Sequence, residues 1–193
     1  MKYRKKLDLR IQKTYLALHN ALTELLYERR FDDVTVNLLC ERAMIRRTTF
    51  YKHFADKYKY LAFYIRELRD GFESQLAPDI ASGHYENYFY DMSRELYQFI
   101  TENRRLVLNL ADSGGNMLFD IMFDLICQDL LVLIRGEEHK SSHQVELKAA
   151  FLAGGLLYSL KWWLDSRSDI TESEFTESLS KIIGDGISDN AGQ

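Results

Sequence analysis

The segment MIRRTTFYKHF, residues 44–54, places hydrogen-bond donors next to large aromatic side chains. The residues before it include four at the spacing of one apolar helix face, Val36, Leu39, Cys40 and Ala43. We therefore predict a short helix with Thr35 as its N-cap, a tight turn at residues 44–45, and a second short helix over residues 46–53.

Helix geometry separates the side chains of this region into two sets. Three apolar side chains, those of Ile45, Phe50 and Phe54, can pack inward on the first helix and fix the angle between the two helices. The others then form one exposed set that is rich in donors: Arg46, Arg47, Thr48, Thr49, Tyr51, Lys52 and His53. Two short helices joined by a tight turn, of which the second is basic, indicate a helix-turn-helix.

The chemistry of the exposed set indicates duplex DNA as the partner. The major groove admits a helix and offers acceptors on guanine and a methyl group on thymine, which suit arginine and threonine. We predict that Arg47 and Lys52 approach the bases. The contacts to phosphate are expected to come mainly from four other side chains, Thr49, Tyr51, His53 and Lys57. Thr35 and the remaining members of the exposed set complete the candidate DNA contacts.

The distribution of charge points to the same end of the chain. The net charge of −4 alone argues against a nucleic-acid partner. Residues 1–60, however, contain 14 Lys and Arg against 7 Asp and Glu, whereas residues 61–193 contain 11 against 22. A head of +7 joined to a body of −11 indicates that one end meets a polyanion, although a scatter of surface charge without function gives the same numbers.

Helical periodicity accounts for the rest of the chain. We predict helices over residues 8–30 and 56–76, the latter with Asp56 as N-cap, and five more over residues 84–100, 101–111, 116–135, 145–166 and 172–184. Pro78 and its small or polar neighbours predict a break at residues 77–83. The expected fold is all-α, with an N-terminal three-helix helix-turn-helix domain (1–55), a connecting helix (56–76), and an antiparallel helical domain for ligand binding and dimerisation (77–193).

The N-terminal third resembles a known family over FDDVTVNLLCERAMIRRTTFYKHFADKYKYL, residues 31–61. Within it, TTFYKHFADK is similar to the pattern of the TetR family of bacterial transcription regulators. The resemblance implies a repressor that binds a palindromic DNA operator as a homodimer and is released by a small-molecule effector. FLAGGLLYSLKWWL (151–164) and TESEFTESL (171–179) resemble a TetR subgroup that includes regulators of dihydroxyacetone kinase operons.

Two positions depart from the family pattern. The family usually has glycine in the turn, where this chain has Met44, and a non-glycine residue with positive φ is disfavoured. The family often has serine or threonine as the cap of the recognition helix, where this chain has Arg46. Because a lost cap costs roughly 1 kcal/mol, Arg46 is interpreted instead as a candidate phosphate or base contact.

The helix predicted over residues 145–166 is apolar almost all round, and such a helix must be buried on more than one side. We expect another subunit to cover the second side, the alternative being a monomer with a thick core. Two glycines inside the helix would allow a partner helix to approach closely. The predicted dimer interface consists of Phe151, Gly154, Gly155, Tyr158, Trp162, Phe175, Leu179 and Ile182.

Aromatic and methionine side chains crowd the helices predicted over residues 84–100 and 116–135. Such density is more often ordinary core than a binding site, but the family resemblance implies an unidentified small-molecule effector between these helices. The candidate pocket residues are Tyr88, Phe89, Met92, Tyr97, Phe119, Met122, Phe123, Tyr158 and Trp162.

Other classes of protein have less support. The chain has no catalytic or phosphate-binding motif, so no enzyme is predicted. His139 and His143 have the spacing of a metal pair, but two ligands without a third are weak evidence for zinc, and no metal or cofactor is predicted. The alternative function is a protein-interaction module that binds DNA weakly and acts through a partner.

The expected compartment is the cytoplasm. The longest uncharged apolar run, near residues 149–160, is too short to span a bilayer, and MKYRKKLDLR at the start is charged with no apolar run after it. The two cysteines stand apart from each other, which is typical of a reducing environment. No membrane partner is therefore predicted.

Overall fold

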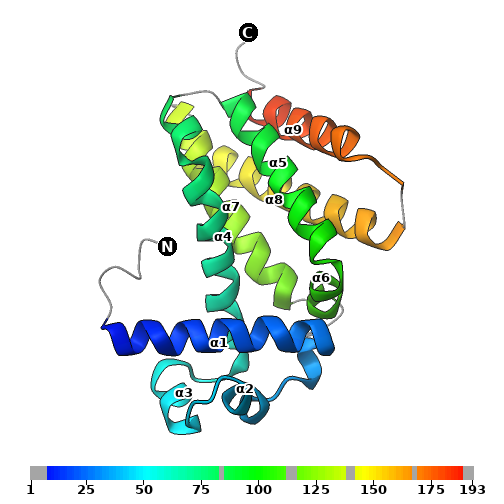
Figure 1. The fold of residues 1–193 in the computed structure, drawn as a ribbon. Coiled ribbons are helices and arrows are strands. Elements are labelled where there is room, and N and C mark those ends of the chain that lie inside the picture. The colour runs from blue at the N-terminus through cyan, green and yellow to red at the C-terminus, as the bar shows by residue number, and fades with distance from the viewer. Residues whose placement is uncertain (1–7, 83–84, 112–116, 138–141, 167–168, 189–193) are drawn as a thin grey trace. The chain divides into compact units, whose positions relative to one another are not determined.

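The computed structural model describes the backbone of residues 8–82, 85–111, 117–137, 142–166 and 169–188. Side chains are described over the same ranges except residues 72–82, 85–89, 133, 135–137, 142, 166 and 186–188. The described residues form α-helices and one 3₁₀ turn, without strands (Figure 1). The predicted all-α fold class is confirmed. The chain divides into two compact units, which are described separately.

The first unit contains the N-terminal helices together with one helix from later in the chain. It covers Met1–Ser74 and Asn103–Leu118. Its elements are α1 (Leu9–Glu28), the 3₁₀ turn η2 (Phe31–Asp33), α2 (Val36–Arg42), α3 (Arg47–His53), most of α4 (Lys57–Ser82) and α6 (Arg104–Ala111). Its core is made by buried side chains from α1, η2, α2, α3 and α4, among them Leu18, Leu22, Leu25, Phe31, Leu39, Phe50, Tyr60 and Tyr64.

Side-chain caps explain where three of these helices begin. Asp8 accepts a hydrogen bond from the backbone N–H of Arg10 at the start of α1. The Thr35 hydroxyl accepts one from Leu38 N at 3.1 Å, and Asp56 accepts two, from the N–H groups of the residues two and three positions later. Each cap satisfies backbone donors that the first turn of a helix leaves without an intrahelical partner. The predicted caps at Thr35 and Asp56 are confirmed.

The second unit covers Gln75–Glu102 and Phe119–Gln193 and is built around its first and last helices, which form a close antiparallel pair. Its helices are α5 (Tyr85–Glu102), α7 (Met117–Glu137), α8 (Ser142–Ser166) and α9 (Glu172–Ser188). The amide of Gln98 on α5 donates to Glu172 on α9 at 3.1 Å. Beside this pair, the Tyr97 ring stacks on Trp163 at 5.2 Å and meets Phe175 at 5.4 Å. These three rings form the core shared by α5, α8 and α9.

Helix α4 corrects one prediction about the chain. It extends to Ser82, so the break predicted at residues 77–83 around Pro78 is wrong. A proline removes one backbone hydrogen bond and crowds the preceding turn, so it disfavours the interior of a helix without excluding it. The helix α6, which the sequence grouped with the C-terminal domain, packs against α1 in the first unit.

Candidate nucleic-acid interface

Helix α3 presents a buried face and a donor-rich exposed face. Phe50 is fully buried, Phe54 is nearly so, and their rings contact each other at 5.6 Å. Phe50 also meets Tyr60 of α4 edge-on at 6.0 Å. This packing fixes the rotation of α3 and turns five side chains outward, those of Arg46, Arg47, Thr48, Tyr51 and Lys52. Thr49 is half-buried at the edge of this face.

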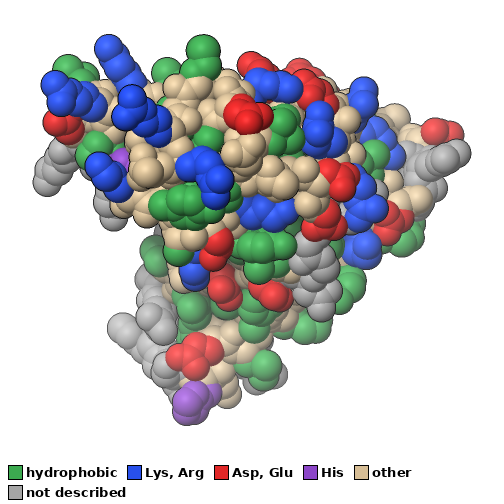
Figure 2. All heavy atoms as spheres, turned by 90° about the horizontal axis from the view of Figure 1, so that it is seen from below, with side chains coloured by type: hydrophobic (Ala, Val, Ile, Leu, Met, Phe, Trp, Pro, Cys, Tyr) green, Lys and Arg blue, Asp and Glu red, His purple; other side chains and the backbone are tan. Residues whose placement is uncertain are grey.

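Lys and Arg side chains are spread over the face of the molecule that carries α1, α2 and α3, as Figure 2 shows. Acidic side chains lie among them, so the face is basic without being uniformly so. Phosphate contacts from such a surface supply the sequence-independent part of DNA affinity, whereas side chains that reach base edges supply specificity. The exposed face of α3 offers groups of both kinds.

The turn between α2 and α3 has the conformation that glycine would normally supply. Met44 has φ of 53° and its side chain is 92 % exposed. Its N–H donates to Glu41 O at 3.1 Å, and Ile45 N donates to Cys40 O at 3.0 Å. This pair of hydrogen bonds is a Schellman motif, which closes α2 and requires a left-handed residue at the position of Met44. The strain anticipated from the missing glycine is therefore present.

Replacing Met44 by glycine is expected to raise the free energy of unfolding by about 1 kcal/mol. A side chain in the left-handed region costs about 1–2 kcal/mol, and the exposed Met44 side chain has little packing to lose. Met44→Ala is the matched control, because alanine keeps the Cβ atom and should leave the stability nearly unchanged. Urea denaturation followed by circular dichroism measures both variants. Destabilisation by Met44→Gly, as for glycine inside a helix, would contradict the assignment.

The starts of α2 and α3 differ in how they are capped. Thr35 uses its oxygen as an acceptor for Leu38 N, which leaves its O–H free to donate outward. Among the described residues, no side chain caps the start of α3, where Arg46 takes the N-cap position in extended conformation. The Arg46 side chain is exposed. The predicted absence of a cap is thus confirmed, and the guanidinium remains available for another partner.

His53 lies at the end of α3 against the first helix. Its Nδ1 is 3.4 Å from the hydroxyl of Tyr15, and the two rings meet edge-on at 5.3 Å. If the hydroxyl donates, the neutral imidazole carries its proton on Nε2 and can donate from there to a phosphate. Burial raises the pKa of Tyr15, with a smaller contribution from the charge of Glu67, so the hydroxyl keeps its proton. The contact between Tyr15 and His53 was not predicted from the sequence.

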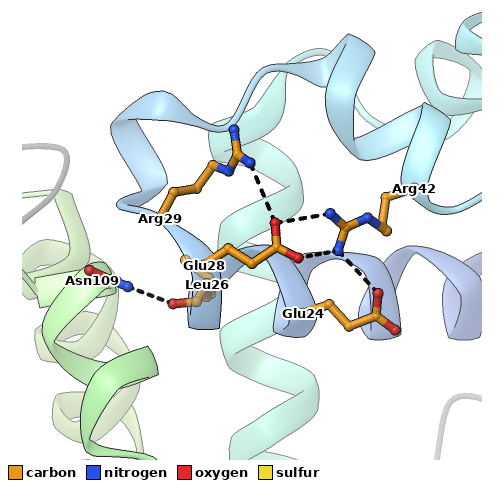
Figure 3. Close-up of polar contacts among 6 residues, drawn as sticks. All are labelled: Glu24, Leu26, Glu28, Arg29, Arg42 and Asn109. Atoms are coloured by element: carbon orange, nitrogen blue, oxygen red, sulfur yellow. Dashed lines mark hydrogen bonds and ion pairs between the residues drawn. The ribbon is translucent and has the colours of Figure 1, made fainter.

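An ion-pair group fixes α2 to α1 (Figure 3). Arg42 donates to both carboxylate oxygens of Glu28, at 2.7 and 2.9 Å, and to Glu24 at 3.3 Å. The hydrogen bonds from Arg42 lower the pKa of Glu28. On the other side of α1, the Asn109 amide of α6 donates to Leu26 O at 2.8 Å, one of the carbonyls left open at the helix end. These contacts hold α1, on which α2 and α3 rest.

Lys57, which the sequence predicts as a phosphate contact, has partners within its own chain. Its ammonium group donates to the backbone carbonyl oxygens of Phe31, Asp32 and Val34 at 3.1, 3.0 and 2.9 Å. The same group lies over the rings of Phe31 and Tyr58. Burial lowers its pKa, while the nearby Asp32 and Asp33 act in the opposite direction. Lys57 therefore points toward the turn between α1 and α2.

The structure divides the predicted effector residues into separate groups. Tyr97 belongs to the aromatic core of α5, α8 and α9, and its hydroxyl donates to Ile170 O at 3.4 Å. Phe119 and Tyr158 are 6.1 Å apart where α7 meets α8. Met92, Met122 and Phe123 are half-buried, whereas Trp162 is exposed. The side chains of Tyr88 and Phe89 lie outside the described residues.

The predicted dimer residues also fall into two groups. Phe151, Gly155, Tyr158 and Trp162 are exposed on α8, and Ile182 is exposed on α9. Phe175 and Leu179 are each only 6 % exposed, because the apolar stripe of α9 is covered by helices of its own chain. These two side chains belong to the core of their own chain, and their predicted contact with a second subunit stays a prediction. Gly154 faces α7, where an added Cβ would lie 3.9 Å from Phe123.

Two further observations concern alternatives raised by the sequence. His143 is exposed, with Nδ1 3.5 Å from a carboxylate oxygen of Glu146, while His139 lies outside the described residues. Within the part of the chain that is described, no helix combines the length and the apolar character needed to cross a membrane.

Comparison with known proteins identifies the family. Residues 84–185 match the TetR family described as the transcriptional regulator C-terminal region, which is more than half of the chain. A TetR transcriptional regulator from Streptococcus agalactiae 2603V is similar in structure, with a TM-score of 0.59 and 23 % identity over 90 % of this chain and 95 % of that chain. A TetR-like transcriptional regulator from Rhodococcus sp. RHA1 has a TM-score of 0.55 and 16 % identity over 93 % of this chain and 97 % of that one. No curated protein matches. The family match covers the body of the chain, and together with the helix-turn-helix at residues 35–53 it shows that the chain belongs to the TetR family of transcriptional regulators.

Proposed function

We propose that this protein is a cytoplasmic repressor that binds a palindromic DNA operator as a homodimer and is released by a small molecule. The observation that carries the proposal is the outward face of α3, where five donor side chains are exposed while Phe50 and Phe54 hold the helix from behind. A helix held at a fixed rotation with donors on one face suits insertion into the major groove. TetR-type regulators act as DNA-binding dimers, which supports the proposed homodimer on a palindromic operator.

The candidate DNA contacts divide into two proposed roles. Arg47 and Lys52 lie exposed on α3 and are proposed to approach base edges, as arginine and lysine do with guanine. Thr49, Tyr51 and His53 are proposed to hold phosphates, together with Thr35 at the start of α2. Arg46 and Thr48 lie at the beginning of α3, where either kind of contact suits a guanidinium or a hydroxyl.

The proposed dimer forms through the exposed stripe of α8. Leu147, Phe151, Gly155, Tyr158 and Trp162 follow one another at intervals of three or four residues, so they lie on one face of the helix. Four of them carry large apolar or aromatic side chains that are more than half exposed. A contiguous stripe of this kind marks an interaction site more often than a free surface. Ile182 on α9 supplies a further exposed apolar side chain.

The proposed effector binds within the second unit. Half-buried Phe119, Met122 and Phe123 of α7, with Tyr158 of α8, offer the apolar lining and single hydroxyl typical of small-molecule sites. A thermal-shift screen of metabolites and cationic drugs, followed by titration of each hit against the DNA complex, tests this part. A ligand that stabilises the protein without changing DNA affinity would contradict release by that ligand. The narrower relation to regulators of dihydroxyacetone kinase operons is proposed on the residues of α8 and α9 alone.

Alanine at Arg47 is expected to weaken binding to the specific duplex by about 1–3 kcal/mol and to relax specificity at one base position. Mobility shifts with the duplex upstream of the protein's own gene, at low salt and against a random duplex, measure this. Asn20→Ala, which replaces an exposed uncharged side chain on α1, is the control and should bind as the wild type does. Equal losses on both duplexes for Arg47→Ala would show that it does not read a base. A wild-type protein that shifts no duplex would favour the protein-interaction module.

A further inference from the structure

The ammonium group of Lys57 is completely engaged by acceptors of its own chain. An ammonium carries three N–H donors and no acceptor. Three carbonyl oxygens lie within hydrogen-bond distance of it, those of Phe31, Asp32 and Val34, at 3.1, 3.0 and 2.9 Å. The rings of Phe31 and Tyr58 lie 4.8 and 5.3 Å from the nitrogen, in the range of cation–π contacts. A phosphate would have to displace one of these partners.

The contact joins two points that flank the helix-turn-helix. Lys57 is the first residue of α4, four positions after the end of α3. The three carbonyls belong to η2 and the residue after it, immediately before Thr35, the N-cap of α2. Phe31 O also accepts from Val34 N at 3.0 Å, so both of its lone pairs are used. One side chain thus ties the entry of α4 to the entry of α2, with α3 between them in sequence.

The surroundings of the Lys57 ammonium group indicate a fixed anchor and not a mobile surface charge. Phe31 and Val34 are buried, so the turn that carries the carbonyls is itself held in the core. Lys57 is half-buried, whereas Lys52 and Lys59 are exposed. Burial lowers the pKa of Lys57, because the ammonium has lost water, whereas the charges of Asp32 and Asp33 act in the opposite direction.

We propose that Lys57 is a positioning residue for DNA binding, which holds Thr35 and the start of α2 at a fixed place relative to α3 and does not itself neutralise a phosphate. The inference rests on the proposed DNA-binding function. It separates contact with a phosphate from positioning of the helices. The sequence pattern alone groups Lys57 with the exposed donors of α3, because it lies close to them in sequence.

The salt dependence of binding distinguishes the two roles. Each phosphate contact that is lost lowers the slope of log K against log salt by about 0.9. The probe is the duplex that the wild-type protein selects from a random library, and fluorescence anisotropy over a series of salt concentrations gives the slope. Lys57→Met keeps the apolar stem and removes the ammonium; we expect about tenfold weaker binding, a smaller ratio of specific to random affinity, and an unchanged slope.

Two matched variants complete the design. Lys52→Met removes an exposed cation from α3 that we propose enters the major groove between the phosphates, so it should lower the slope by up to about one and show that the assay detects a lost charge at the interface. Lys57→Arg keeps the charge, but a planar guanidinium cannot direct three N–H groups from one nitrogen toward three carbonyls. We expect Lys57→Arg to lose affinity with an unchanged slope, whereas a phosphate contact would be preserved by arginine.

Three results of the binding assay would overturn the proposal: a slope for Lys57→Met that falls by about one, full binding by Lys57→Arg, or no loss of affinity in Lys57→Met. Circular dichroism at the assay temperature confirms that each variant is folded, so loss of stability alone cannot produce the change in specificity ratio. The carbonyl ¹³C chemical shifts of Phe31, Asp32 and Val34 supply a readout without DNA. They should move in Lys57→Met, and unmoved shifts would overturn the anchor. A wild type that binds no duplex would instead overturn the proposed function.

Discussion

Alanine in place of Phe50 is expected to destabilise the first unit by about 3–5 kcal/mol, the usual range for removing a fully buried phenylalanine. The Phe50 ring contacts Phe54 of the segment after α3 and Tyr60 of α4, at centroid distances of 5.6 and 6.0 Å. Its loss would leave a cavity between α3 and the helices that support it. Because α3 has only seven residues, it has little stability of its own without this packing.

Chemical denaturation followed by circular dichroism measures the loss of stability, and hydrogen exchange locates it. The amides of α3 should lose protection first in Phe50→Ala. Tyr51→Ala is the matched control, because its ring is adjacent on the same helix but about half exposed, and it should cost less than about 1 kcal/mol of stability while weakening DNA binding. If both variants lost the same stability, Phe50 would not be the anchor of α3.

Glutamate in place of Phe151 is expected to separate the proposed dimer. Phe151 is 78 % exposed on α8, in the stripe that we propose for the interface. At a two-fold interface the substitution removes two carboxylates from water, one from each subunit, which costs several kcal/mol and weakens association at least about 100-fold. Operator binding should fall with it, because a single half-site contributes only part of the affinity.

Light scattering at micromolar concentration decides the oligomeric state. The wild type should scatter as twice 22.7 kDa, and Phe151→Glu as 22.7 kDa. Val132→Glu is the matched control: Val132 is 74 % exposed on α7 and is not a member of the α8 stripe, so its replacement should leave the dimer intact. A wild-type mass of 22.7 kDa, or a Phe151→Glu protein that stays dimeric, would contradict the proposed interface.

The local structure of the helix-turn-helix could be predicted because it depends on neighbours in the sequence. The spacing of apolar residues set the helices, and threonine and aspartate marked where two of them begin. The absence of glycine at Met44 predicted a strained turn, and the residue has φ of 53°. A Schellman motif requires this left-handed conformation whatever the side chain. The pattern of residue types was therefore sufficient to predict the conformation of the turn.

Contacts between distant segments could not be predicted in the same way. Periodicity shows that α9 has one apolar face but not which helix covers it, so Phe175 and Leu179 were assigned to a dimer although their own chain buries them. The acceptors of Lys57 lie 23 to 26 residues earlier in the chain, and only the folded first unit brings them to its ammonium. The pairing of α6 with α1 through Asn109 likewise depends on tertiary packing.

The most direct test of the central claim is selection of duplexes from a random library by the purified wild-type protein, followed by sequencing. A dimeric reader that places α3 of each subunit in the major groove should enrich a palindrome whose half-sites are roughly one helical turn apart, on one face of the DNA. The enriched duplex should bind far more tightly than a random one of equal length at the same salt concentration. A library that stays unenriched after several rounds, or an enriched motif without two-fold symmetry, would contradict a dimer that reads DNA through α3.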